Sequence, residues 1–444
     1  MADTSELIKF RDEVLNTKSK SFCGAKWGNS TLWLNSGETA SCHLPPVHKI
    51  DAEQVKKDPS KLHNTDHKIK MRDLMQEGDK PAECDYCWKV ESMGPTFVSD
   101  RVFKSLQFTP EEMQKWYDAS PSERIVPPTI EIMFDRTCNF ACSYCNANFS
   151  TEWAKDIHKN GFYEGSTRGM GAFKHDGSID NCYEKANNPF IDAWWEWWPE
   201  IAEELRVLRI TGGEPLMSDD VWKLFDRVID EQREFEVGVN TNLGAKDSLI
   251  DKLIRKSWGI KKLSIFTSME SVGEQAEYIR DKLDYNHWKN NVEKILGDSN
   301  VEKMILMMTI NALCVFSLVD MLKQMMEWKE KYPAKNVRIS INFLRFPAFQ
   351  SLTILPDNIR NKTKKDLEEW YSTVKDSPLL NTMEKGDIER LISYVDVIKT
   401  PHSYDTNLEE NKKDFKNFFM QYDKRRGKSI RIFPQEFLEW YDNL

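Results

Sequence analysis

Six short runs of β-branched and aliphatic residues recur between residues 130 and 341 of the chain. These candidate strands are Ile130–Phe134, Arg206–Ile210, Glu236–Asn240, Leu263–Phe266, Lys303–Thr309 and Val337–Ile341. Between them, apolar residues recur at helical spacing, as in Asp219–Glu231, Tyr285–Leu296 and Ser317–Glu330. Repeated strand–helix units predict a parallel α/β sheet with right-handed crossovers and a ligand site at the carboxyl ends of its strands. Six units favour an open, partial (β/α)6 barrel over a closed eight-stranded one.

The patterning also divides the chain. Residues 1–105 predict a small N-terminal α+β module, with β-like pieces around Gly37 and an amphipathic stretch near Ile69–Met75. Residues 106–128 predict a helical linker, with Thr109 as the N-cap and a boundary at the two prolines that end it. The barrel is expected over 129–361, with a loop insertion over 156–188, and a charged helical extension over 362–444.

Composition and charge narrow the class of protein. The 444 residues are 40% hydrophobic and 30% charged, which is typical of a globular protein. A formal net charge of −9 provides no overall basic field, so a nucleic-acid partner is not expected. No apolar run approaches the ~18 residues that span a bilayer, and the first residues do not form a signal peptide. We therefore expect a cytoplasmic protein with no membrane partner.

Nine cysteines stand out in a chain of this expected location. A reducing compartment disfavours a disulfide framework, so clustered thiols indicate metal. The positions are Cys23, Cys42, Cys84, Cys87, Cys138, Cys142, Cys145, Cys182 and Cys314. Two groups are therefore candidate metal sites, whereas Cys182 and Cys314 are isolated. Cys314 fits buried packing, and Cys182 is either an ordinary thiol or a hydrogen-atom donor in the loop insertion.

The central group lies in the motif C-N-F-A-C-S-Y-C, directly after the first candidate strand. Cys138, Cys142 and Cys145 have the spacing of thiolates that surround one face of an iron–sulfur cubane. Three thiolates leave one iron of a 4Fe–4S cluster without a protein ligand, so a small molecule can bind there. The alternatives are a zinc site, which normally needs a fourth ligand, or three unrelated thiols.

This motif, with Tyr144 before its third cysteine, resembles the signature of the radical S-adenosylmethionine (SAM) superfamily. The resemblance implies that SAM binds the open iron and that an electron from the cluster cleaves it to a 5′-deoxyadenosyl radical. It also implies an electron donor such as a reductase, flavodoxin or ferredoxin. The catalytic cysteines would be Cys138, Cys142 and Cys145.

Two downstream strand ends extend the resemblance. The second strand ends in T-G-G-E-P, which resembles the family motif that binds the SAM amino group. The matching residues are Gly212, Gly213, Glu214 and Pro215. The third strand ends in N-T-N-L-G, where Thr241 and Asn242 are expected to line the site or, alternatively, to cap a helix.

The fourth strand leads into T-S-M-E-S, and Y-I-R follows it. In relatives, a Ser-x-Asp at this strand end contacts the SAM ribose, and a later arginine pairs with the SAM carboxylate. Ser268, Glu270 and Arg280 match these places, although Glu270 has one methylene more than the usual aspartate. A surface salt bridge is the alternative for Arg280.

Cys23, Cys42, Cys84 and Cys87 form the N-terminal group, and four thiolates complete either a cluster or a structural zinc site. The order Cys, Gly, Cys, then Cys-x-x-Cys resembles the twitch (SPASM-like) auxiliary-cluster modules. It implies a second, auxiliary 4Fe–4S cluster. In most of the family this module follows the barrel, whereas here it precedes the barrel.

The sequence does not identify the substrate. Auxiliary clusters in relatives accompany oxidation or modification of peptides, proteins or small alcohols, so one of these is the expected partner. The alternatives are a non-catalytic iron–sulfur or redox-sensing protein and an activase for a glycyl-radical partner. A tryptophan-rich run suggests stacking on a base or peptide, but the apolar residues Phe190, Trp194, Trp197, Ile201 and Leu205 follow helical spacing and predict a packed helix.

Overall fold

The computed structural model describes residues 4–165, 170–177, 187–397 and 407–444. The chain forms two compact units. The first comprises Met1–Asp135, Asn181–Thr211 and Arg233–Val237, and the second comprises Arg136–Asp180, Gly212–Gln232 and Gly238–Leu444. The chain is a mixed α/β protein, and each of the six predicted strands is present with ends within two residues of the prediction.

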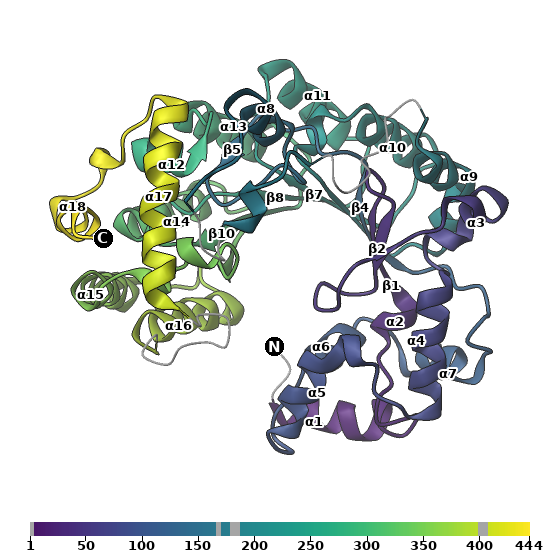
Figure 1. Ribbon diagram of the computed structural model, residues 1–444. Helices are drawn as coiled ribbons and strands as arrows, with labels where there is room; N and C mark the ends of the chain where they lie inside the picture. The colour runs from purple at the N-terminus through teal and green to yellow at the C-terminus, as the bar shows by residue number, and fades with distance from the viewer. Residues whose placement is uncertain (1–3, 166–169, 178–186, 398–406) are drawn as a thin grey trace. The chain divides into compact units, whose positions relative to one another are not determined.

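The first unit is built on strands in the order β6-β4-β1-β2-β3. Their bounds are β1 Asn29–Trp33, β2 Glu38–Ala40, β3 His48–Lys49, β4 Thr129–Met133 and β6 Val207–Thr211. β4 runs parallel to both β6 and β1, whereas β1 and β2 form an antiparallel hairpin (Figure 1). The N-terminal segment therefore contributes strands to the same sheet as β4.

The hairpin between β1 and β2 turns at Gly37. This residue has φ of +64°, and an added Cβ would lie 2.2 Å from the ring of Phe190. A side chain there would be strained by the backbone and would also collide with Phe190. Phe190 lies in the first turn of α9 (Pro189–Glu204), in which Trp194, Trp197 and Trp198 are buried. The prediction of a packed helix is confirmed.

Helices enclose the rest of the first unit. Besides α9 they are α1 Thr4–Phe10, α2 Ala25–Gly28, α3 Ala52–Lys57, α4 Asp66–Glu77, α5 Asp85–Ser92, α6 Asp100–Ser105 and α7 Pro110–Asp118. α7 begins where the sequence predicts, because Thr109 accepts from the Glu112 backbone N–H while the Glu112 side chain accepts from the Thr109 N–H. α4 contains the predicted amphipathic stretch.

The second unit contains the remaining parallel strands, in the order β11-β10-β8-β7. Their bounds are β7 Glu236–Thr241, β8 Leu263–Ser268, β10 Lys303–Ile310 and β11 Asn336–Phe343, and β7 begins in the first unit. β10 pairs in parallel with β8 and with β11. A separate antiparallel pair joins β5 (Ala141–Cys142) to β9 (Arg280–Asp281).

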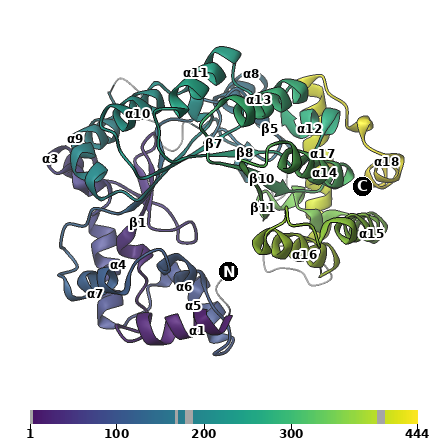
Figure 2. The ribbon, with the colours of Figure 1, turned by 180° about the vertical axis from the view of Figure 1, so that it is seen from behind.

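Helices of the second unit connect and cover these strands. They are α8 Thr151–Asn160, α10 Asp219–Asp230, α11 Asp247–Ser257, α12 Gly273–Ile279, α13 Tyr285–Asp298, α14 Leu318–Lys331, α15 Asp357–Val374, α16 Thr382–Val397, α17 Leu408–Arg426 and α18 Gln435–Asp442. Figure 2 shows α13 and α14 along the strands that they connect, as parallel crossovers require. The first residues of the loop insertion expected over 156–188 are helical instead, because α8 continues to Asn160.

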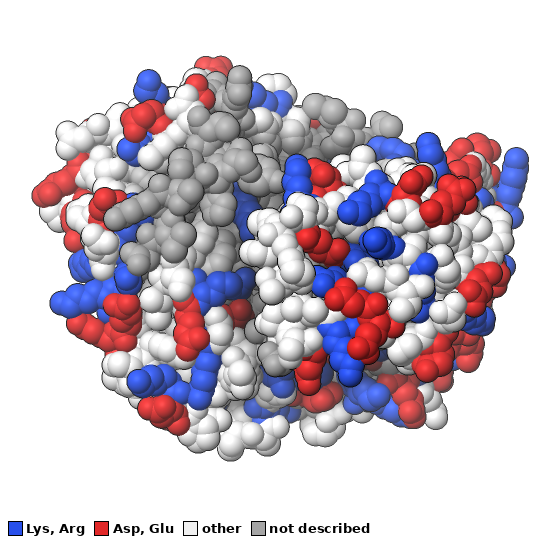
Figure 3. Space-filling view, turned by 90° about the horizontal axis from the view of Figure 1, so that it is seen from below, with Lys and Arg blue, Asp and Glu red and all other residues white. Residues whose placement is uncertain are grey.

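Two surface properties bear on the expected partners. Among the described residues, no helix is long and apolar enough to cross a membrane. Lys and Arg side chains are interspersed with Asp and Glu over the coloured part of the face in Figure 3.

Candidate active site

The three-cysteine motif lies in the second unit, in the loop that ends at α8. Ser150 caps α8 by accepting from the Glu152 and Trp153 backbone N–H groups. Cys142 lies in β5, and the Cys145 N–H donates to the Cys142 carbonyl at 2.9 Å. β5 pairs with β9, so the sheet pair holds the middle of the motif against the segment that carries Arg280.

N–H groups surround the sulfurs of this loop. The Phe140 N–H lies 3.4 Å from Cys138 Sγ and the Asn242 side-chain amide lies 3.9 Å from it, while an Arg280 guanidinium nitrogen lies 3.9 Å from Cys142 Sγ. Burial raises the pKa of Cys138 to about 12 and also raises the pKa values of Cys142 and Cys145. Free thiols here stay protonated, whereas a bound iron would ionise them and the N–H donors would then stabilise the thiolates.

The T-G-G-E-P turn lies directly against the cysteine loop. Gly212 has φ of +147°, and an added Cβ on Gly213 would lie 2.4 Å from the Thr137 carbonyl oxygen. The Glu214 N–H donates to that same carbonyl at 2.7 Å. The two glycines therefore permit a close backbone approach between the motif and the loop. Pro215 follows and starts a single turn in which Pro215 and Leu216 are buried.

Glu214 is a buried carboxylate held by three donors. It accepts from Thr241 Oγ1 at 2.6 Å, from the Asn242 N–H at 2.7 Å and from the Leu216 N–H at 3.0 Å. Burial raises the pKa of Glu214 to about 7, against the opposing effect of these donors. The carboxylate is therefore partly protonated near neutral pH and is suited to bind a cationic group.

The end of β7 also joins the cysteine loop. The Asn242 side-chain amide donates to Asn139 Oδ1 at 2.8 Å and accepts from the Gly244 N–H at 2.8 Å. The N-cap of helix α11 is instead Lys246, which makes no side-chain capping bond. The helix-capping alternative for Thr241 and Asn242 is therefore wrong, because both side chains bond to the strand-end cluster.

Glu270 and Arg280 form a buried ion pair. Their side chains lie 2.5 Å apart and are 1% and 5% exposed, and the Tyr144 hydroxyl donates to the other Glu270 oxygen at 3.1 Å. The surface salt bridge considered for Arg280 is thus wrong. Burial is the largest single influence and lowers the pKa of Arg280, but the negative charge of Glu270, its hydrogen bond to Arg280 and the nearby Tyr144 and Cys142 together outweigh it, and the net shift is upward. Burial also raises the pKa of Tyr144.

This pair differs from the expected arrangement, in which each residue would contact SAM. The longer side chain of Glu270 reaches Arg280 itself. The Arg280 Nε is buried and has no hydrogen-bond partner within the described residues, so one donor of this guanidinium stays available to a ligand. Ser268 lies half-buried at the end of β8, beside Met307 of β10.

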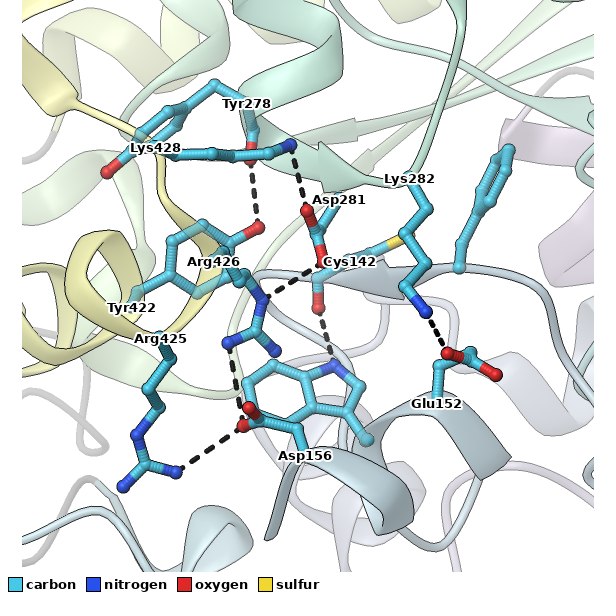
Figure 4. Close-up of polar contacts among 12 residues, drawn as sticks. Cys142, Glu152, Asp156, Tyr278, Asp281, Lys282, Tyr422, Arg425, Arg426 and Lys428 are labelled. Atoms are coloured by element: carbon cyan, nitrogen blue, oxygen red, sulfur yellow. Dashed lines mark hydrogen bonds and ion pairs between the residues drawn. The ribbon is translucent and has the colours of Figure 1, made fainter. Parts of the chain in front are cut away.

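Helix α17 also supports the cysteine loop. The carbon of the Arg426 guanidinium lies 4.5 Å from the centroid of the Trp153 ring and 4.3 Å from that of the Tyr422 ring. Arg426 also lies 3.2 Å from Asp281 of β9 (Figure 4). Trp153 Nε1 donates to the Cys142 carbonyl at 2.9 Å. Sequence reasoning missed this role, although aromatic residues at helical spacing before a basic run are visible in the tail.

The four N-terminal cysteines line one cavity of the first unit. The walls include Cys23, Cys42, Cys84, Cys87, Lys26 and Trp88. Burial raises the pKa values of Cys23, Cys84 and Cys87 to about 11. Across the described residues no three Cys, His, Asp or Glu side chains are gathered around a single point. A cubane cluster does not need its four sulfur ligands to meet at one point, because each thiolate binds a different iron. For a cluster site, the cavity that the four cysteines share is therefore the relevant observation.

The two isolated cysteines lie elsewhere. Cys314 is fully buried, and its sulfur contacts the Asn311 carbonyl and N–H, both at 3.3 Å, as expected for packing. Cys182 lies outside the described residues.

Comparison with known proteins gives matches among solved structures alone. No protein-family model and no curated protein matches the sequence. The chain is similar to Streptococcus suis SuiB bound to S-adenosylmethionine, with 9% identity and a TM-score of 0.35, over 78% of this chain and 68% of that chain. It is also similar to a histidine-tagged anSMEcpe with bound AdoMet, with 13% identity and a TM-score of 0.33, over 55% and 57% of the two chains.

A third similar structure is native anSMEcpe with bound AdoMet and the Kp18Cys peptide. Its identity is 13% and its TM-score 0.32, over 55% of this chain and 59% of that chain. This chain therefore spans between 57% and 68% of the length of these proteins.

Proposed function

We propose that this chain is a radical SAM enzyme. The observation that carries the proposal is the junction of the three-cysteine loop with the G-G-E-P turn. The Glu214 N–H bonds to the Thr137 carbonyl, and the buried Glu214 carboxylate lies in one hydrogen-bond cluster with Asn242, which contacts Cys138 Sγ. Three thiols beside an ionisable carboxylate are the groups needed to hold a cluster and an amino acid that binds its open iron.

The residues divide the work as follows. Cys138, Cys142 and Cys145 would hold a 4Fe–4S cluster, which supplies the electron that cleaves SAM to the 5′-deoxyadenosyl radical. The ionised carboxylate of Glu214 binds the SAM amino group. Arg280, through its free Nε–H, orients the SAM carboxylate, and burial of the site excludes water.

The remaining assignments extend this core. We place Ser268 and Glu270 near the SAM ribose and treat the parallel strands as a partial (β/α)6 barrel. A twitch-like module would hold the auxiliary cluster on Cys23, Cys42, Cys84 and Cys87. The substrate is a peptide, a protein or a small alcohol, and a reductase, flavodoxin or ferredoxin supplies electrons in the cytoplasm.

Replacing one cluster ligand tests the enzyme assignment. Anaerobically reconstituted Cys142→Ala should form no 5′-deoxyadenosine from SAM and dithionite. Cys314→Ala is the matched control, because it removes a buried thiol that lies outside both groups, and it should retain cleavage. Normal SAM cleavage by Cys142→Ala would disprove the assignment.

A non-catalytic iron–sulfur protein is the second candidate. The closed Glu270–Arg280 pair favours it, because two residues expected to contact SAM contact each other. Such a protein would load iron fully and yet cleave no SAM. An activase would instead cleave SAM and co-purify with a glycyl-radical partner.

A further inference from the structure

Three cationic side chains are buried in the module that carries the four-thiol cavity. Lys26, Lys68 and Arg72 are 4%, 1% and 0% exposed. Burying a charge without an opposing charge costs several kcal/mol, so groups of this kind normally accompany an anion.

Their partners supply little negative charge. Lys68 Nζ lies 3.1 Å from Ser30 Oγ, 2.8 Å from Thr39 Oγ1 and 3.3 Å from His63 Nδ1, all neutral groups. Burial lowers the pKa of Lys68 well below its usual value, with the charge of Arg72 adding to the effect. No carboxylate touches this amine within the described chain.

Arg72 also bonds to neutral groups. Its guanidinium donates to the Lys26 carbonyl at 3.1 Å and to Asn64 Oδ1 at 3.1 Å, and it lies 2.7 Å from His63 Nε2. Lys26 pairs with Glu83, which is also 2.6 Å from His67. Among the described residues, Glu83 is therefore the one carboxylate that contacts any of the three cations.

Lys26 is the cation of this group that lines the cavity, together with the four cysteines. Its backbone N–H donates to the Cys23 carbonyl at 2.9 Å. Lys68 and Arg72 lie on α4, whose Met75 lines the cavity together with the four cysteines. The buried Lys26 ammonium therefore borders the cavity, where a cluster with four thiolates would supply net negative charge.

We propose that Lys26, supported by Arg72, raises the reduction potential of the auxiliary cluster bound by the four N-terminal thiols. The inference rests on the auxiliary-cluster part of the proposed function. Reduction adds one electron to the cluster, with no bond formed or broken, and increases its negative charge. A buried ammonium beside the cluster stabilises the reduced state more than the oxidised state.

The test is a redox titration monitored by electron paramagnetic resonance. All variants carry Cys142→Ala in the full-length chain, so that the N-terminal cluster alone gives the signal. Lys26→Met should make reduction at least about tenfold less favourable, which lowers the one-electron midpoint potential by about 59 mV. Lys26→Arg keeps the charge and should retain most of the potential. The control Lys89→Met removes a lysine that is 76% exposed on α5 and should shift it little.

The outcomes separate the inference from the function it rests on. If the Cys142→Ala parent holds zinc or no iron, the auxiliary cluster itself is disproved, and Lys26 has no cluster to tune. If the parent and Lys26→Met both hold iron at the same potential, the inference about Lys26 is overturned while the cluster stands. If Lys26→Met fails to fold, Lys26→Gln replaces it: a lower potential supports the inference, and an unchanged one overturns it.

Discussion

Glu214 gives the sharpest quantitative prediction of the site. Its carboxylate is 1% exposed, and burial raises its pKa to about 7. The ionised carboxylate is the form that accepts hydrogen bonds from the SAM amino group, so SAM affinity should rise as pH rises through the pKa of Glu214. The ionised fraction is about one tenth at pH 6 and about three quarters at pH 7.5, which gives about eightfold tighter binding, or about 1.2 kcal/mol.

Glu214→Gln removes the charge and keeps the shape. A hydrogen bond to a charged group contributes about 1.5–3 kcal/mol, so SAM should bind this variant about 10- to 150-fold more weakly at pH 7.5. Its affinity should also lose the dependence on pH. Equilibrium dialysis of labelled SAM against anaerobically reconstituted protein measures both effects.

Two further comparisons check the reasoning. Glu302→Gln neutralises a half-exposed carboxylate just before β10 and should leave SAM affinity unchanged. Without SAM, the raised pKa of Glu214 makes its contribution to stability greatest at low pH and smaller as pH rises through 7. Wild type should therefore lose about 2 kcal/mol of unfolding free energy relative to Glu214→Gln between pH 5.5 and 8. A pH-independent SAM affinity in wild type, or full affinity in Glu214→Gln, would refute this role.

Three other substitutions test the surroundings of the site. Arg280→Met should lower the free energy of unfolding in chemical denaturation by about 3–5 kcal/mol, because it leaves Glu270 as a buried uncompensated charge. Adding Glu270→Leu should recover most of that loss. An unchanged denaturation midpoint for Arg280→Met would contradict the buried pair. Trp194→Ala should cost about 3–5 kcal/mol of unfolding free energy if α9 is a packed helix, and a loss below about 1 kcal/mol would contradict that packing. Arg426→Met should reduce the iron content of the three-cysteine site in elemental analysis, because it loosens the tryptophan that bonds to the cysteine loop. Lys424→Met, which changes an exposed residue of the same helix, should load iron like wild type.

The strands and the main helices could be predicted because their signals are local. A run such as Lys303–Thr309 shows its β-branched and aliphatic character in a few residues, and β10 indeed covers Lys303–Ile310. Thr109 and Glu112 form a capping box that is visible within one turn. The motifs also lie at strand ends, where parallel topology gathers ligands.

Contacts between distant segments could not be predicted in the same way. The parallel pairing of β1 with β4 and the seat of Arg426 between Trp153 and Tyr422 depend on the tertiary fold. The Glu270–Arg280 pair depends on one methylene of side-chain length, which sequence spacing does not resolve.

SAM cleavage by the reconstituted wild-type protein tests the central claim most directly. The measurement combines iron and sulfide counting with quantification of 5′-deoxyadenosine after dithionite reduction under anaerobic conditions. We predict about eight irons per chain and formation of 5′-deoxyadenosine from SAM. A protein that carries its full iron complement and forms no 5′-deoxyadenosine would contradict the assignment of this chain as a radical SAM enzyme.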